Sequence, residues 1–136
     1  MRFRDGPVVF ATPRCDDLYV SLRVLIVDDH PGFRRSARRM LELDGFEVVG
    51  EAEDGASAVA LARELRPDVV LLDIALPDRS GFDVADELRG TRAKIVLVSS
   101  RDRSAYGSRI AAANAVEFIP KDRLSAAAVR AAVEDT

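Results

Sequence analysis

The sequence has very little cysteine or histidine: Cys15 and His30 are the only residues of these types among 136, and there is no tryptophan. A lone cysteine excludes an internal disulfide, and one cysteine with one histidine excludes a zinc site built from those ligands. No apolar run approaches the roughly 18 residues of a membrane span. The polar residues 1–5 are not followed by the apolar segment of a signal peptide. We therefore expect a cytoplasmic protein that does not associate with membranes.

An excess of charge of one sign is also missing. The sequence has 20 basic and 23 acidic residues, a net charge of −3, so the domain as a whole is not expected to bind nucleic acid. Lysine is scarce, because Lys94 and Lys121 are the only two and the other basic residues are arginines. This bias fits a GC-rich genome, and it makes each lysine worth examining. The length suits one domain of about 100–150 residues, and 48% hydrophobic residues are enough for a core.

Regular patterning begins near residue 21. Residues 1–20 show no sustained period and contain Gly6-Pro7 and Pro13, so we expect an irregular leader that the domain of residues 21–136 does not need. Beyond it, short β-branched runs alternate with helical patterns. Strands are expected at 22–27, 46–51, 68–72, 94–99 and 116–119. Helices are expected at 31–44, 55–66, from Ser80, at 104–113, and from Asp122 or Ser125 onward.

Five strand–helix units predict an α/β fold with a doubly wound parallel sheet covered by helices on both faces. Such sheets bind ligands beyond the carboxyl ends of their strands. No Gly-x-Gly-x-x-Gly and no P-loop motif is present, so the nucleotide-binding folds that use these motifs lack support.

The expected strand ends carry a distinctive set of polar residues: Asp28-Asp29, Asp73, Ser99-Ser100 and Lys121. Three carboxylates on one edge repel one another unless a cation joins them. Carboxylate oxygens suit Mg²⁺, which binds through one or two carboxylates together with phosphate oxygens. A lysine opposite them supplies positive charge for a phosphoryl group. This edge of the sheet is therefore expected to accept phosphate on a carboxylate.

The ordered runs VLIVDDHPGFRR, VVLLDIALPDRSG, IVLVSS and FIPKD resemble the receiver domains of bacterial two-component response regulators, from residue 22 to about 134. The Asp-Asp-His-Pro and Lys-Asp forms are similar to receivers joined to LuxR-like DNA-binding domains. The resemblance implies a flavodoxin-like five-stranded sheet in the order 2-1-3-4-5.

The resemblance also implies the site residues. The phosphoacceptor would be Asp73, with Lys121 and Ser99 contacting the phosphoryl group, Ser99 and the aromatic Phe118 acting as a switch, and Mg²⁺ held by Asp28, Asp29, Asp73 and the backbone carbonyl of Ala75. Some family members carry tyrosine where this chain has Phe118, so no phenolic hydroxyl is available at that position. Ala75 and Arg101 match positions that tune the lifetime of the phosphoryl group.

The partner implied by the resemblance is a sensor histidine kinase. Phosphorylation would alter the surface of helix four, strand five and helix five and so control an output. That output is transcription if an effector domain follows in the native gene. A phosphorylation-dependent homodimer is a further partner that the resemblance allows. The domain would be a phosphoacceptor with self-phosphorylation and self-dephosphorylation chemistry rather than an enzyme. The arginines of the first helix are either a solvated face or a kinase-docking surface: Arg34, Arg35, Arg38 and Arg39.

Two other functions are alternatives for these residues. The first is a receiver-like interaction module that is never phosphorylated, although such modules lose an acidic residue or the lysine and this chain keeps them. The second is an aspartate-nucleophile phosphatase, which the residues exclude because neither Asp28-Asp29-His30 nor Asp73-Ile74-Ala75 has the Asp-x-Asp spacing. His30, next to Pro31, is expected to be a helix-entry residue beside the site rather than a catalytic one.

Overall fold

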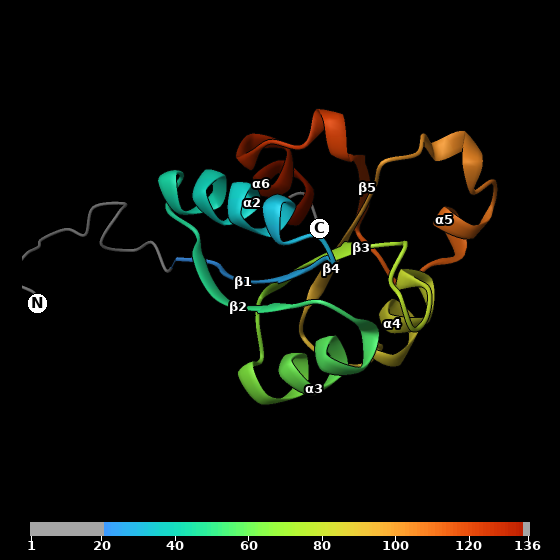
Figure 1. Ribbon diagram of the computed structural model, residues 1–136, viewed down its shortest axis with the longest axis horizontal. Coiled ribbons are helices and arrows are strands. Elements are labelled where there is room, and N and C mark those ends of the chain that lie inside the picture. Colours follow the sequence, from blue (N-terminus) through green and yellow to red (C-terminus); the bar gives the residue numbers. More distant parts are fainter. Residues whose placement is uncertain (1–20, 135–136) are drawn as a thin grey trace, which may run out of the picture.

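The computed structural model describes residues 21–134, so the expected leader lies outside the described residues (Figure 1). Within that range five strands form one sheet: β1 (Arg23–Val27), β2 (Glu47–Ala52), β3 (Val69–Asp73), β4 (Lys94–Ser99) and β5 (Glu117–Pro120). All four pairings are parallel and the order is β2-β1-β3-β4-β5. The predicted doubly wound, flavodoxin-like sheet in the order 2-1-3-4-5 is confirmed.

Helices cover both faces of this sheet. The helical elements are α2 (Pro31–Leu43), α3 (Gly55–Leu65), α4 (Gly81–Glu87), η1 (Arg103–Ala105), α5 (Arg109–Ala112), η2 (Lys121–Arg123) and α6 (Ala126–Glu134). Figure 1 shows α2 and α6 on one face, with α3 and α4 on the other. None of the helices within residues 21–134 is both long and apolar enough to cross a bilayer.

The core is split by the sheet because successive side chains of a strand point to opposite faces. Leu25 of β1 and Leu72 of β3 pack with α3 and α4, whereas Ile26 and Leu71, their neighbours in sequence, pack with α2 and α6. All five residues of β3 are buried. A continuous apolar run is what a strand needs when helices cover it on both sides.

Local signals fix where several helices begin and end. The carboxylate of Asp54 accepts a hydrogen bond of 2.8 Å from the Ser57 amide at the start of α3. Ser80 Oγ accepts one of 3.3 Å from the Asp83 amide at the start of α4. Helix α2 ends at Leu43, two residues before Gly45, whose φ of +92° suits glycine.

The helix expected at 104–113 was wrong. The chain there forms the short turn η1 and the single-turn helix α5, separated by Tyr106, Gly107 and Ser108. Gly107 has a φ of +56°, which a right-handed helix cannot contain. The last helix begins after Ser125, whose Oγ accepts a hydrogen bond from the Ala128 amide, so Ser125 rather than Asp122 marks its start.

Candidate functional site

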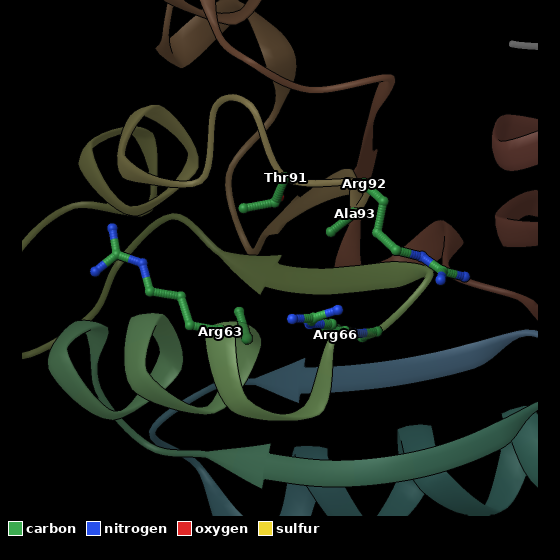
Figure 2. A pocket seen from close by; sticks show the side chains of 7 residues that line it. Arg63, Arg66, Thr91, Arg92 and Ala93 are labelled. Atoms are coloured by element: carbon green, nitrogen blue, oxygen red, sulfur yellow. The ribbon is translucent and has the colours of Figure 1, made fainter.

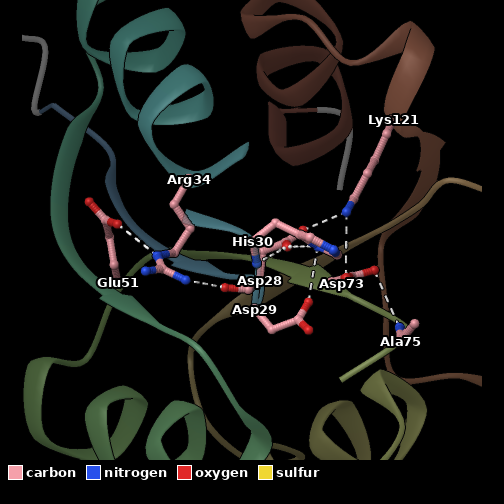
Figure 3. A network of polar contacts seen from close by, with 8 residues as sticks. All are labelled: Asp28, Asp29, His30, Arg34, Glu51, Asp73, Ala75 and Lys121. Carbon is pink, nitrogen blue, oxygen red and sulfur yellow. Dashed lines mark hydrogen bonds and ion pairs between the residues drawn. The ribbon is translucent and has the colours of Figure 1, made fainter. Parts of the chain in front are cut away.

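Three buried polar side chains of the described chain lie at the carboxyl ends of neighbouring strands. Asp28 follows β1 and is fully buried, while Asp73 ends β3 and Ser99 ends β4. They are the only polar or charged residues classed as buried within residues 21–134. Lys121 follows β5 and extends toward the two carboxylates (Figure 3). The structure therefore brings together most of the site that the sequence predicted.

Lys121 is the cation of this group. Its Nζ lies 2.6 Å from Asp28 Oδ2 and 3.5 Å from Asp73 Oδ2. The ammonium also lies 4.4 Å from the centroid of the Phe33 ring on α2, within the range of a cation–π contact. The carboxylate oxygen Oδ2 of Asp28 is buried and, apart from this ion pair, has no hydrogen-bond donor within the described residues.

The environment of Asp73 stabilises the protonated carboxyl more than water does, so the pKa of this side chain is raised. Burial, together with the negative charge of Asp28, raises the pKa of Asp73 to about 6, although Lys121 and the Ala75 amide oppose the rise. That amide donates to Asp73 Oδ1 over 3.3 Å. Burial lowers the pKa of Lys121, but hydrogen bonding and attraction to Asp28 and Asp73 outweigh it, so the net shift is upward.

Asp29 and His30 complete an acidic cluster at the mouth of the site. His30 Nδ1 lies 3.1 Å from an oxygen of Asp28 and 3.1 Å from an oxygen of Asp29. The His30 amide donates to Asp28 Oδ1 over 2.8 Å. The sequence predicted a helix-entry residue beside the site, and the structure places the His30 ring against both carboxylates (Figure 3).

These residues fit a divalent cation. One donor atom from each of Asp28, Asp29, His30 and Asp73 can be chosen so that all lie within 4.8 Å of one another. The donors are mainly hard carboxylate oxygens, which suit Mg²⁺, and the buried Asp28 Oδ2 has unused accepting capacity. The Ala75 carbonyl stays a predicted ligand, since the contact seen between Ala75 and the site is made by its amide.

Ser99 faces a residue that the sequence reasoning missed. Its Oγ lies 2.5 Å from the hydroxyl of Tyr106 and accepts a 3.0 Å hydrogen bond from the Arg101 amide. Phe118, the expected aromatic switch, is already buried with 3% exposure and meets the Tyr106 ring edge-on. The family pattern pointed to position 118 alone, so it gave no signal for a tyrosine in the loop after β4.

Two further residues that were missed support the segment after Asp73. A Cβ atom added to Gly81 would lie 2.4 Å from the Asp73 carbonyl oxygen, so only glycine fits there without displacing the backbone. The Asp78 carboxylate accepts hydrogen bonds from the Gly55 and Ala56 amides at the start of α3. The sequence showed a turn around Ser80-Gly81 but not these contacts.

The arginines of α2 divide into two groups. Arg34 and Arg38 both pair with Glu51 of β2, over 2.9 and 2.7 Å, and Arg34 also donates to the Asp28 carbonyl over 2.6 Å. Arg35 and Arg39 are exposed and form no ion pair within residues 21–134. Arg34 and Arg38 are therefore engaged within the domain, and the choice between a solvated face and a docking surface remains only for Arg35 and Arg39.

A separate pocket of about 330 Å³ lies at the opposite edge of the sheet, before β3 and β4 (Figure 2). Its lining includes Arg63, Arg66 and Arg92. The three guanidinium groups point in different directions in Figure 2, and Arg92 is paired with Asp68. With no converging groups, this pocket is a weaker candidate site than the acidic cluster.

Comparison with known proteins agrees with the geometry. The family model described as the response regulator receiver domain matches residues 24–134. This chain belongs to that family. It is therefore a receiver domain of two-component response regulators, a signalling fold rather than a member of a classical enzyme family.

Curated relatives and solved structures support this assignment. The nitrate/nitrite response regulator protein NarP of Escherichia coli K12 is 46% identical over 103 residues, which are 74% of this chain and 48% of NarP. The response regulator GacA of Pseudomonas viridiflava is 37% identical over 103 residues, again 74% and 48%. This receiver thus spans about half the length of the curated relatives it matches.

Among solved structures, a signal receiver domain described as that of NarL from Mycobacterium tuberculosis has a TM-score of 0.79 and 34% identity, covering 85% of this chain and 98% of that one. A LuxR-family two-component response regulator from Aurantimonas sp. SI85-9A1 has a TM-score of 0.75 and 33% identity, covering 82% of each chain. The likeness to LuxR-type regulators that the sequence suggested is confirmed.

Proposed function

We propose that this receiver accepts a phosphoryl group on Asp73 from the phosphohistidine of a sensor histidine kinase, with Mg²⁺ as cofactor. The observation that carries the proposal is the convergence of two buried carboxylates, Asp28 and Asp73, on the single ammonium of Lys121. A buried acidic pair is unfavourable for a structural role alone, because desolvation and mutual repulsion oppose its ionisation.

In the reaction, an oxygen of the Asp73 carboxylate attacks phosphorus as the phosphorus–nitrogen bond of the phosphohistidine breaks. The bonding electron pair goes to the imidazole nitrogen, and the product is an acyl phosphate on Asp73. Lys121 is placed to offset the negative charge on the transferred group. Asp28 and Asp29 would hold Mg²⁺ with Asp73 and the Ala75 carbonyl, and when bound this ion would neutralise phosphoryl charge.

Phosphorylation would then be detected through Ser99, whose hydroxyl would turn toward the new phosphoryl oxygens. The surface expected to change comprises η1, α5, β5 and α6, because Ser99 contacts the loop that leads into them. Exposed Arg35 and Arg39 on α2 are suited to contact an acidic surface of the kinase.

We further propose transcription control as the output, in the cytoplasm, through an effector domain or a phosphorylation-dependent dimer. Relatives of which this chain matches about half the length include named transcription regulators. A solved relative covered over 82% of its chain is a LuxR-family response regulator. A receiver-like module that is never phosphorylated is the competing function, and retention of all three aspartates and Lys121 weighs against it.

The test is incubation of the chain with acetyl phosphate and Mg²⁺, followed by intact mass spectrometry and peptide mapping. We expect one added phosphoryl group on Asp73, none in EDTA and none in Asp73→Asn. Asp86→Asn is the matched control, because Asp86 lies exposed on α4 away from the site, and it should be phosphorylated like the parent. Absence of modification in the folded parent would support the competing function instead.

A further inference from the structure

Tyr106 lies between the phosphorylation site and the surface that would change. Its ring packs edge-on against Phe82 of α4, with centroids 5.6 Å apart, and against Phe118 of β5, at 5.8 Å. Its hydroxyl lies 2.5 Å from Ser99 Oγ. Tyr106 therefore joins the end of β4 to both α4 and β5.

Both hydrogen bonds of the Ser99 side chain are made to this loop. One joins Ser99 Oγ to the Tyr106 hydroxyl, and the other is donated by the Arg101 amide. Within residues 21–134, no hydrogen bond joins Ser99 to Asp73 or Lys121. If Ser99 is to bind a phosphoryl group on Asp73, its Oγ has to exchange these partners for the phosphoryl oxygens.

A switch residue at Phe118 would have to turn from an exposed position into the core, but the Phe118 ring already lies in the core. Its ring is 3% exposed, belongs to the core beneath α3 and α4, and has the Arg103 guanidinium 5.4 Å from its centroid. Phe118 also offers no polar atom that could sense the Ser99 hydroxyl. Tyr106 differs on both counts, since its ring is only half-buried and its hydroxyl already contacts Ser99.

The backbone around Tyr106 is suited to rearrangement. A three-residue turn precedes it, and Gly107, with a φ of +56°, separates it from the four-residue α5. No continuous helical hydrogen-bond ladder has to break for the Tyr106 ring to move.

We propose that Tyr106, rather than Phe118, is the aromatic residue coupled to Ser99. Its hydroxyl holds Ser99 in the unphosphorylated arrangement and is released when Ser99 binds the phosphoryl group. Tyr106 is a positioning residue, because it acts through Ser99 and touches neither Asp73 nor Lys121. This inference rests on the proposed phosphorylation of Asp73.

The first test measures binding of beryllium fluoride, a phosphoryl mimic, in the presence of Mg²⁺ by calorimetry. Tyr106→Phe keeps the ring and removes the hydroxyl, so it should bind the mimic roughly two- to tenfold more tightly than the parent, the range given by loss of one hydrogen bond. Tyr106→Phe made together with Ser99→Ala should bind no more tightly than Ser99→Ala alone, because the partner of the hydroxyl is gone.

Unchanged affinity in Tyr106→Phe, or the same tightening without Ser99, would overturn the coupling. Failure of the parent to bind the mimic and to take a phosphoryl group would instead overturn the proposed function together with the inference. The two failures are therefore distinguishable within one set of titrations.

The second test uses tyrosine emission. The sequence has no tryptophan and two tyrosines, Tyr106 and Tyr19, the latter outside the described residues. In Tyr19→Phe, emission reports Tyr106 alone. Adding beryllium fluoride with Mg²⁺ should change the intensity as the hydroxyl loses Ser99, and Ser99→Ala should abolish the change. Constant emission in Tyr19→Phe while the mimic binds would show that Tyr106 does not respond.

Discussion

Lys121 makes its closer ion pair with Asp28 rather than with Asp73: Nζ lies 2.6 Å from Asp28 Oδ2 and 3.5 Å from Asp73 Oδ2. The lysine thus supplies the positive charge that a fully buried carboxylate requires. A divalent cation at the acidic cluster would take over that task. Lys121 would then be free to interact with Asp73 and its phosphoryl group.

This arrangement predicts that Lys121→Gln is destabilised in EDTA and partly recovered by Mg²⁺. Removing the ammonium leaves Asp28 buried without a counter-charge, a change that costs about 3 kcal/mol in the free energy of unfolding. Mg²⁺ would restore positive charge beside Asp28. Thermal melts of the parent and variant in EDTA and in excess MgCl₂ measure both effects.

Lys94→Gln is the matched control, since Lys94 is the other lysine of the sequence and begins β4 at the opposite edge of the sheet. Any destabilisation of Lys94→Gln should be the same with and without Mg²⁺. Equal recovery of both variants by Mg²⁺ would show that the ion acts on the whole chain rather than at Asp28.

Asp73→Asn should be more stable than the parent at pH 8 in EDTA. The pKa of Asp73 is raised from 3.8 to about 6, so ionising this side chain at pH 8 opposes folding. Each pKa unit corresponds to about 1.4 kcal/mol, which gives an expected gain of roughly 1–3 kcal/mol for the neutral amide. The variant should also gain less from Mg²⁺ and accept no phosphoryl group.

The pH dependence of this gain has a definite sign. Because the folded pKa of Asp73 lies above the unfolded value, the folded parent binds more protons between about pH 4 and pH 6. The stability of the parent relative to Asp73→Asn should fall as the pH rises through this window, and the two should converge near pH 4. Urea melts at several pH values check this, and a gap that widens toward pH 4 would contradict it.

Deleting residues 1–19 tests the part of the chain that lies outside the described residues. The sequence there has no regular period, so we expect the shortened chain to melt and to be phosphorylated as the parent is. A loss of more than roughly 2 kcal/mol in the free energy of unfolding would show instead that the leader packs as structure.

The fold could be predicted from the alternation of apolar strand runs with helical patterns, and the acidic cluster from the residues at the ends of those strands. Parallel strands place their carboxyl ends on one edge, so Asp28, Asp73 and Lys121 could be brought together from their position after apolar runs alone. Tyr106 could not, since its approach to Ser99 depends on the path of a loop that Gly107 diverts from the expected helix. Loop paths leave no period in the sequence.

Gly81 is another residue whose role only the packing reveals, and Gly81→Ala tests it. An added Cβ would lie 2.4 Å from the Asp73 carbonyl oxygen and 2.8 Å from Ile74 Cα, and neither backbone atom can move without displacing Asp73. We expect a loss of about 1–3 kcal/mol in stability and slower phosphorylation of Asp73. Gly32→Ala is the control, because the nearest atom to its Cβ would be an Arg35 side-chain nitrogen at 3.8 Å, an ordinary contact. Equal phosphorylation rates with acetyl phosphate for Gly81→Ala and Gly32→Ala would show that the Asp73 backbone tolerates the methyl group and that this contact does not position the carboxylate.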